Sequence, residues 1–498
     1  MKYLILLLFI TFPCSLAFAD DLLAGIAKVD ITRPGHDAGE NPPFVTALVL
    51  SSGKTNAVVI AVDAVAIAEI GSIRDPYLVD VRAALQDQFS ISPASVIINA
   101  SHCHAVVSTD ITNLTIQAVE TAWENRVPVM AGTGIGHIED IMINRRIRLK
   151  DGTDADERHA YALPLDSEVE SVGPIDPEIG ILRLDRIDNG ETLAIIFQFA
   201  CHPIQGVPGG GNTADISGFA ARTIEKHFRS GTTTALFLQG CGGDINPIRY
   251  KSINTPRDGE PLGNKLGLST MEAARDIETK PKEKLSILSR KIQVPRANLA
   301  PRIADMQAGI AALTKSLRGT TLNFESFVPL YVKYHLSGDY PAEAAHQYLQ
   351  DDLLKKEDWK KLDENNRAAM ESYLNNIRTM EKLTRKQINR ALLEKHRARN
   401  EEAGPTAEAE VTALRVGDFH LVTFPAEVVV EVGLNIKEKS SFPKTFVSGY
   451  TNGYLYYAPT VEQMKNRGNA QEDSDCLLAP GWQEMFESTA LNMLKELP

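Results

Sequence analysis

Five short apolar runs, each of strand length and each followed at once by polar residues, constrain the fold of this chain more than any other feature. They are residues 96–99 before His102 and His104, 193–200 before His202, 235–238 before Asp244, 420–424 before Glu427, and 445–447 before Tyr457. In open α/β sheets, ligands and catalytic groups gather just beyond the carboxyl ends of the strands. The pattern therefore predicts an α/β fold with these side chains gathered at one end of a sheet.

Strand-like and helix-like stretches alternate over residues 22–290, and strand-like patterns return over 408–460. The clearest are the β-branched runs 44–50 and 57–62, the helical spacings at 73–89 and 219–228, and a hairpin pattern that joins 407–416 to 419–424. Alternation of this kind is typical of an α/β core whose sheet is buried on both faces. We therefore expect one domain, residues 20–498, built on a mixed sheet.

Residues 296–402 have a different character and predict a helical insertion. Apolar side chains recur there every three to four residues with dense charge between them, at Ile303, Met306, Ile310, Leu313 and Leu317, and again at Met370, Leu374, Ile377, Met380 and Leu383. This spacing is that of amphipathic helices. We expect a helical hairpin with a less regular link over 331–348. Its role stays open between structural padding, a cap over the site and a surface for partners.

The first nineteen residues have the composition of a signal peptide. Lys2 supplies the positive end, residues 3–12 are apolar, and Ala17-Phe18-Ala19 offers a small-residue cleavage site. The apolar stretch is too short to span a bilayer, and no later segment is long and apolar enough to do so. We therefore expect residues 1–19 to be removed and the protein to be exported, to the periplasm or outside the cell, with no transmembrane segment.

Charge and cysteine content exclude some classes of protein. The net charge of −12 argues against nucleic acid as a partner, because phosphate binding needs a basic surface. After the leader, the cysteines are Cys103, Cys201, Cys241 and Cys476. Their even number permits disulfides in an oxidising compartment. They are too sparse for a disulfide scaffold, so we favour the interpretation that they are small buried hydrophobic residues.

The histidines and the glutamate that follow the apolar runs are candidate metal ligands. His102 and His104 would point to the same face if the preceding strand extended to them, although such a pair alone is weak evidence. Glu427 enters an apolar run, where a charge must be paired or metal-bound. The ordinary alternatives are a buried histidine for His202 and a salt bridge or helix-start carboxylate for Glu427. Imidazole and carboxylate ligands with an open position suit catalytic zinc, and they suit other divalent metals too.

Two further motifs carry residues that suit a catalytic site. Residues 240–244 are glycine-rich after a strand, which allows close approach of a ligand, but they lack the lysine of a phosphate-binding loop. Arg145, in the run Asn144-Arg145-Arg146, could hold an oxyanion or a substrate carbonyl. A surface position is the ordinary alternative for this arginine.

Taken together, these motifs resemble those of the neutral ceramidases, which are zinc amidases that cleave N-acylsphingosine. The resemblance covers roughly residues 23–290 and 408–466, in the right order. The matching segments are 98–104 around the His-x-His motif, Asn144-Arg145, His202-Pro203, Pro425-Ala426-Glu427 and the tyrosine-rich run 452–457. The resemblance implies that zinc (Zn²⁺) is held by His102, His202, Glu427 and Tyr457. It also implies that Arg145 lies at the site and that His104 is a neighbouring group which assists proton transfer.

The chain departs from the family in ways that bear on the substrate. Asn246 stands where ceramidases have a serine, and residues 105–107 differ from the family's glycine-containing turn. Asparagine can contact a substrate but is not a plausible nucleophile, so we expect Asn246 to bind substrate. Asp244 would either orient a zinc-bound histidine or hold a turn. The helical insertion has no counterpart that we can place, and there is no room before Pro498 for the family's C-terminal immunoglobulin-like domain.

The sequence thus predicts a mixed-sheet α/β catalytic domain with a helical insertion and the function of an exported zinc-dependent hydrolase. We expect it to cleave an amide bond like that of N-acylsphingosine with a zinc-activated water. Two alternatives remain open. The first is a zinc hydrolase acting on a sugar derivative, a lactone or another amide, and the second is an inactive binding protein on the same scaffold. The expected partner is a small-molecule or lipid substrate, and the oligomeric state stays open.

Overall fold

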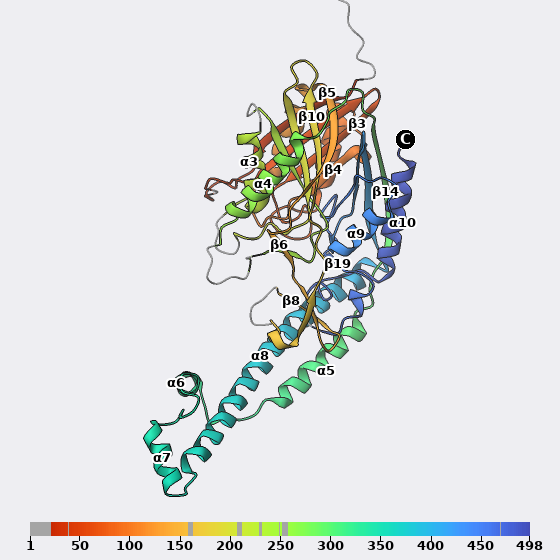
Figure 1. Cartoon of the computed structure of the whole chain (residues 1–498). Coiled ribbons are helices and arrows are strands. Elements are labelled where there is room, and N and C mark those ends of the chain that lie inside the picture. The colour runs from red at the N-terminus through yellow and green to blue at the C-terminus, as the bar shows by residue number, and fades with distance from the viewer. Residues whose placement is uncertain are drawn as a thin grey trace, which may run out of the picture.

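The structure is a computed structural model that describes residues 21–37, 39–157, 163–206, 212–228, 232–248, 250, 257–468 and 470–498. The predicted signal peptide, residues 1–19, lies outside the described residues. Figure 1 shows a body built from sheets and helices, from which a long helical arm projects. The body contains the chain's strands, and the arm is made from the range 296–402 that predicted a helical insertion.

The body is built on an eight-stranded mixed sheet. Its strands are β1 (Leu23–Asp30), β2 (Phe44–Ser52), β3 (Thr55–Val62), β4 (Val96–Ala100), β5 (Val127–His137), β10 (Glu178–Arg186), β11 (Thr192–Phe199) and β12 (Thr234–Gln239). They lie in the order β12-β11-β10-β5-β1-β2-β3-β4. The β3–β4 and β11–β12 pairs are parallel, and the other neighbours are antiparallel. The predicted mixed α/β fold is therefore confirmed.

Helices and a second sheet cover the main sheet. The helices of the body are α1 (Pro76–Phe89), α2 (Ile111–Glu124), α3 (Asp215–His227), α4 (Glu260–Arg275), α9 (Val430–Lys439) and α10 (Gly481–Glu496). The second sheet has the order β14 (Leu285–Pro295), β15 (Thr406–Val416), β16 (Phe419–Thr423) and β18 (Thr445–Ser448). Leu182 and Leu236 of the main sheet share a buried cluster with Leu414, Leu421 and Phe446 of the second sheet. Burial of apolar area between the two sheets is thus one source of the fold's stability.

Short strands and turns complete the body around the ends of the main strands. They are β6 (Met142–Asn144), β7 (Arg146–Leu149), β8 (Asp154–Asp156), β9 (Val169–Val172), β13 (Ile245–Pro247), β17 (Glu427–Val428) and β19 (Tyr457–Ala458), with 3-10 turns at Pro93–Ser95, Asp166–Glu168 and Gln463–Lys465. β13 pairs with β6, and β17 pairs in parallel with β19. These short pairings bring segments that are distant in sequence to the same place.

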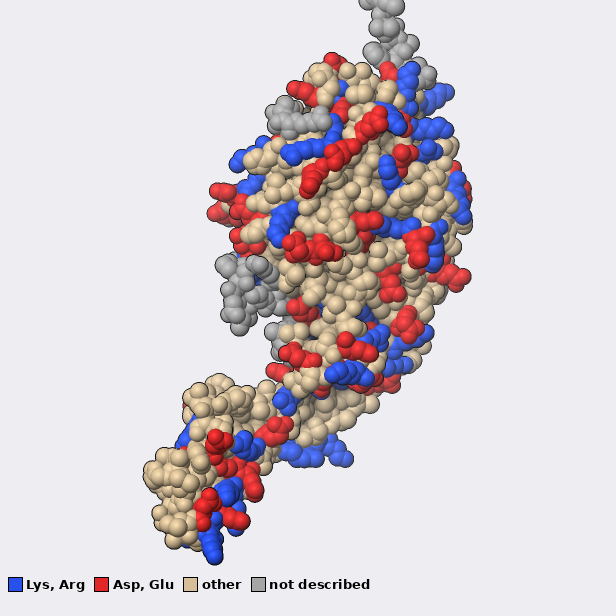
Figure 2. All heavy atoms as spheres, viewed as in Figure 1, with Lys and Arg blue, Asp and Glu red and all other residues tan. Residues whose placement is uncertain are grey.

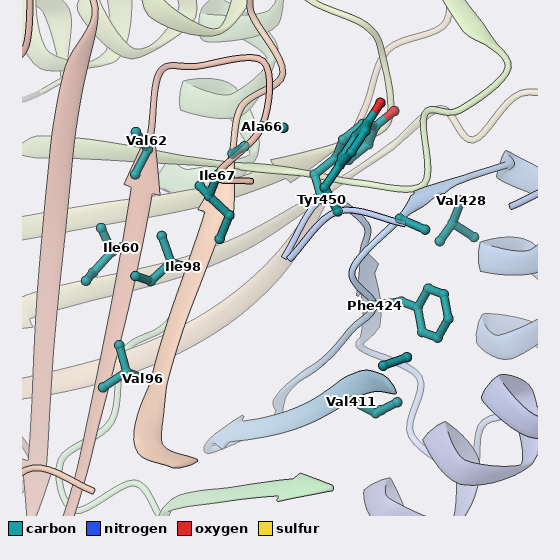
Figure 3. Packing of buried hydrophobic residues seen from close by; sticks show 14 of the residues in the cluster. Ile60, Val62, Ala66, Ile67, Val96, Ile98, Val411, Phe424, Val428 and Tyr450 are labelled. Atoms are coloured by element: carbon teal, nitrogen blue, oxygen red, sulfur yellow. The ribbon is translucent and has the colours of Figure 1, made fainter. Parts of the chain in front are cut away.

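The carboxyl ends of β4, β12 and β18 are tied together by buried hydrogen bonds. Asn99, on β4, accepts at Oδ1 from the backbone N–H of Gln239 at 2.8 Å and donates from Nδ2 to the carbonyl of Gly449 at 2.9 Å. Figure 3 shows part of the surrounding buried cluster, in which Ile98 of β4 joins Tyr450 and other side chains of the C-terminal segments. The carboxyl ends of the edge strands β4 and β12 therefore lie side by side. This agrees with the prediction that the polar residues after these strands gather in one place.

The arm consists of α5 (Ala300–Ser316), α6 (Phe324–Leu336), α7 (Ala345–Leu353) and α8 (Asp358–Ala403). α5 and α8 pack side by side, and α6 and α7 lie at the far end (Figure 1). The prediction of a less regular link over 331–348 is therefore wrong for most of that range. Asn323 caps α6 by accepting from the N–H of Ser326 at 2.9 Å, and Phe327 and Tyr334 pack against Met370 of α8.

The surface of the molecule carries many charged side chains and a few large apolar ones (Figure 2). Figure 2 shows charges of both signs spread over the body, whereas the far end of the arm is largely uncharged on one side of this view. Phe324, Leu336 and Leu353 are exposed there. None of the helices in the described ranges has the length and apolar character needed to cross a bilayer. The cysteines named above are free and buried, in agreement with the interpretation that they are small hydrophobic residues.

Candidate metal centre

His102 is placed by a sharp turn after β4 rather than by the strand itself. β4 ends at Ala100, and His102 has a φ of 67°, in the left-handed region that non-glycine residues rarely adopt. Its backbone N–H donates to the carbonyl of Ala64 at 3.0 Å, which holds this conformation. The condition that the strand extends to His102 and His104 is therefore not met. The His104 ring nevertheless lies 5.5 Å from the His102 ring, nearly perpendicular to it.

Backbone carbonyls fix the tautomers of the two buried histidines. Nδ1 of His102 lies 2.6 Å from the carbonyl oxygen of Val65, and Nδ1 of His202 lies 3.0 Å from that of Ile245. A carbonyl oxygen can only accept, so Nδ1 carries the proton in each ring. Nε2 of each histidine is therefore the atom that faces the site.

Glu427 meets both Nε2 atoms. It lies on β17, and its Oε2 is 3.3 Å from Nε2 of His102 and 3.1 Å from Nε2 of His202. All three side chains are about 2–3% exposed, and one ligand atom from each lies within 4.8 Å of the others. The hydroxyl of Tyr454 donates to Oε1, and that of Tyr450 donates to Oε2 at 3.4 Å. These two tyrosines hold the carboxylate in place.

This donor set fits a divalent cation. Two Nε2 atoms and an ionised carboxylate converge at one buried point, and a buried carboxylate is costly unless a positive charge lies beside it. Burial lowers the pKa of His202 to about 3, so its ring is neutral at pH 7. Burial opposes ionisation of Glu427, but its contacts with His102 and His202 hold the pKa of the carboxyl well below the usual range. Neutral imidazoles and an ionised carboxylate are the forms that bind metal.

Tyr457, the fourth ligand that the resemblance implies, is brought to the same place by strand pairing. It lies on β19 directly opposite Glu427 of β17. Its backbone N–H donates to the carbonyl of Asp475 at 3.1 Å, and the guanidinium of Arg145 lies 5.4 Å from its ring centroid. Tyr457 therefore lines the same cavity as the three candidate ligands.

Arg145 is a buried part of the site and not a surface residue. It is 1% exposed, and Nε donates to Oε1 of Glu472 at 2.6 Å. Nη2 donates to the carbonyl of Gly243 at 2.6 Å, and Nη1 donates to Oδ1 of Asn246 at 3.1 Å. Burial alone would lower the pKa of Arg145, but Tyr457 and Glu472 hold that pKa well above its ordinary value. The guanidinium is therefore charged and held rigidly against the cavity.

Asn246 and Asp244 contact residues next to the site but do not line its cavity. Asn246 is fully buried on β13 and lies outside the cavity lining, where its Oδ1 accepts the hydrogen bond from Arg145. Asp244 accepts from the N–H of Val430 at 2.8 Å and from Nδ2 of Asn144 at 3.1 Å. The expectation that Asp244 orients a histidine is wrong, because backbone carbonyls hold both Nδ1 atoms. Its alternative, a turn-holding role, agrees with these contacts.

The site opens into a small polar cavity of about 130 Å³. Its lining combines residues from the body with one residue of the arm: Val65, Ile70, His102, His104, Arg145, His202, Ile204, Tyr250, Lys395, Glu427, Tyr454, Tyr456, Tyr457 and Asp475. Most of these side chains carry polar atoms. The cavity therefore suits a polar ligand better than a long apolar chain.

Sequence reasoning gave no role to several residues of the site, among them Tyr450, Tyr454, Glu472 and Lys395. Tyr454 lies in the run 452–457 that identified Tyr457, and Tyr450 lies just before it, so this segment was the available signal. Glu472 lies in a loop, in an acidic run that gave no structural signal. Lys395 lies on α8, and helical spacing in the insertion does not reveal which end of the arm meets the body.

The fold and the buried group define a mixed α/β protein with a candidate metal centre at its strand ends. Two solved structures have this fold: the neutral ceramidase from Pseudomonas aeruginosa, at a TM-score of 0.59, and a ceramidase complexed with C2, at 0.60. Sequence identity is 17% in both comparisons, which cover 96% of this chain and 75% and 76% of the two ceramidase chains. The chain therefore has the neutral-ceramidase fold, as the motifs predicted. No protein-family description matches the sequence, and no curated protein matches it.

Proposed function

We propose that this protein is a zinc-dependent hydrolase that cleaves an amide bond, with zinc held by His102, His202, Glu427 and Tyr457. The observation that carries the proposal is the convergence of two Nε2 atoms on Oε2 of Glu427, at 3.1 and 3.3 Å, in a buried cavity. The names of the two solved structures with this fold supply the class of reaction, because a ceramidase hydrolyses an amide.

The residues around the centre suit hydrolysis. A zinc ion held there would supply a water activated at neutral pH and would polarise the substrate carbonyl. Arg145, charged and held by Glu472 and Asn246, would stabilise the negative charge that develops on the carbonyl oxygen. His104 lines the cavity on its solvent side and would carry a proton to the leaving nitrogen.

The size of the cavity favours a small polar amide over N-acylsphingosine. Pockets for drug-sized ligands typically have volumes of about 300–1,000 Å³, whereas this cavity has about 130 Å³. N-acylsphingosine carries two long alkyl chains, and the cavity lining offers them few apolar side chains. The replacement of the family's serine by Asn246, which here holds Arg145, points the same way. A lactone or a sugar derivative would use the same groups.

Parallel assays of zinc-loaded and chelator-stripped protein test this proposal. The substrates are a short-chain fluorescent ceramide and two small amides, N-acetylglycine and N-acetylglycinamide. We expect zinc-dependent release of acetate from a small amide and slower turnover of the ceramide, and we expect Arg145→Gln to lose turnover while it keeps zinc. Turnover of ceramide alone would assign the sphingolipid substrate. Bound zinc with no turnover of any substrate would contradict the proposal and favour a binding protein.

A further inference from the structure

The arm delivers a positive charge to the cavity. Lys395, on α8, lines the cavity together with the candidate metal ligands. Its Nζ lies 4.6 Å from the ring centroid of Tyr456, which lines the cavity as well. The side chain is exposed to solvent overall, so its ammonium group is accessible to a ligand that enters from outside.

The position of Lys395 is fixed by its neighbours on α8. Nε2 of His396 lies 2.7 Å from Oδ1 of Asp475, and the His396 ring lies 4.5 Å from the Tyr456 ring. One turn further along the helix, Arg399 forms an ion pair with Glu69. This segment of α8 is therefore docked on the body, and the lysine is presented to the cavity by a rigid element.

Lys395 differs from the neighbouring cationic side chains, which form ion pairs with carboxylates. Arg145 is paired with Glu472, and Arg399 is paired with Glu69. Within the described part of the chain, no carboxylate is in ion-pair contact with Lys395, and its ammonium group lies over the Tyr456 ring. The two cavity carboxylates are occupied in other ways: Glu427 contacts the two histidines and Tyr454, and Asp475 contacts His396.

We propose that Lys395 determines specificity by binding an anionic group, such as a carboxylate, on the substrate of this site. The inference rests on the proposed function, which it narrows to small amides that carry a negative charge, a class that includes short N-acyl amino acids. The ammonium group acts as a point charge that needs no fixed ligand geometry. A purely structural role, in which Lys395 only packs on Tyr456 to hold α8, predicts no preference between charged and neutral ligands.

The test uses a matched pair of ligands that cannot be hydrolysed. 4-Oxopentanoate has the shape of N-acetylglycine with a methylene in place of the amide nitrogen, and 4-oxopentanamide is its neutral counterpart. Binding of each to the zinc-loaded full chain is measured by isothermal titration calorimetry. We expect the carboxylate to bind about fivefold or more tightly than the carboxamide, as for a partly solvated ion pair.

Three variants separate charge from packing. Lys395→Met keeps the aliphatic stem and should lose the preference, whereas Lys395→Arg should keep it. Lys361→Met, on the same helix but at the far end of the arm beside the exposed Glu357, is the matched control and should behave like the wild type. Zinc content and thermal unfolding temperature confirm that each variant is folded.

The outcomes distinguish this inference from the proposed function. Equal affinity of the wild type for the two ligands, no binding of the carboxylate, or an unchanged preference in Lys395→Met would overturn the role of Lys395. Zinc-dependent hydrolysis of N-acetylglycinamide in those circumstances would leave the proposed hydrolase intact. Conversely, a charge preference that depends on Lys395 without turnover of any amide would support the anion site and contradict the hydrolase.

Discussion

The tautomers of His102 and His202 decide what the buried site can hold. Both Nδ1 atoms donate to backbone carbonyls, those of Val65 and Ile245, so both Nε2 atoms face Glu427. Metal-ligating histidines commonly donate their other N–H to a carbonyl or a carboxylate, which fixes the ring orientation. The chain therefore sets the orientation of its candidate ligands through main-chain groups, which side-chain substitution cannot easily remove.

Asn246 is the residue whose replacement should separate catalysis from metal binding. In Asn246→Ala, Nη1 of Arg145 loses its acceptor at 3.1 Å while the candidate metal ligands are untouched. A buried donor left without a partner costs about 1–3 kcal/mol. We expect zinc content to stay the same, the free energy of unfolding to fall by about this amount, and kcat for a small amide to fall by about tenfold or more.

The comparison for Asn246→Ala is Asn189→Ala, in an exposed loop where the side chain of Asn189 hydrogen-bonds with Glu191. This variant should leave zinc content, unfolding and kcat close to those of the wild type. Wild-type kcat in Asn246→Ala would show that the hydrogen bond to Arg145 does not support catalysis.

Asp63, which follows β3, should give the folded protein a distinct pH dependence. Burial raises the pKa of Asp63 from 3.8 to about 6, although the N–H of Phe44 donates to its Oδ2. Between about pH 4 and 6 the folded state therefore binds this proton more tightly than the unfolded chain does. The contribution of Asp63 to the free energy of unfolding should thus decrease as pH rises through this range, by about 3 kcal/mol in total.

Urea unfolding at several pH values between 4 and 7 measures this dependence. Because other groups titrate too, the informative quantity is the difference between the wild type and Asp63→Asn. The variant should gain stability relative to the wild type as pH rises from 4 to 6. A difference that is constant across this range would contradict the raised pKa.

At the scale of elements, α8 connects the arm to the site. Its buried contacts with the body include the ion pair between Arg385 and Asp156 and the contact between His396 and Asp475. Asp156 also accepts from the backbone N–H of Gln471 at 2.5 Å, in the loop that carries Glu472. Asp156 therefore connects the arm to the loop whose Glu472 accepts from Arg145.

Arg385→Met should be strongly destabilising because it removes the Arg385 guanidinium from its buried ion pair with Asp156. Both side chains are about 1% exposed or less, and removal of one partner of a buried ion pair costs about 3–5 kcal/mol. The double variant Arg385→Met with Asp156→Asn should recover part of this loss, because it removes both charges of the pair. Chemical denaturation of the single and double variants measures both values. A cost below about 1 kcal/mol in the single variant would show that the pair behaves as a solvated surface contact.

At the scale of the whole molecule, the sequence predicts what is local and misses what depends on distant contacts. His102, His202 and Glu427 were accessible because each comes shortly after an apolar strand, so local pattern alone places it at a sheet end. Glu472 was not accessible, because it reaches Arg145 across 327 positions through a loop without regular pattern. Lys395 was not accessible either, because its place at the cavity depends on how α8 docks.

The same distinction applies to the fold. The strands β2, β3, β4, β11 and β12, the hairpin of β15 and β16, and the helices α1 and α3 were predicted from local pattern, and the resemblance supplied the class of sheet. The strand order β12-β11-β10-β5-β1-β2-β3-β4 could not be predicted from periodicity, because pairing between distant strands leaves no local signal. The last part of α6 was missed because capping by Asn323 and packing on Met370 outweigh its weaker spacing.

The zinc content of the purified chain tests the central claim most directly. After equilibrium dialysis against zinc, the wild type should hold about one zinc ion per chain, at a site with histidine and carboxylate ligands. Glu427→Ala should hold far less, because the carboxylate between His102 and His202 is gone. Glu431→Ala, on the neighbouring helix α9, is the control and should retain the metal. Absence of zinc from the wild type, or full retention in Glu427→Ala, would contradict the metal centre described here.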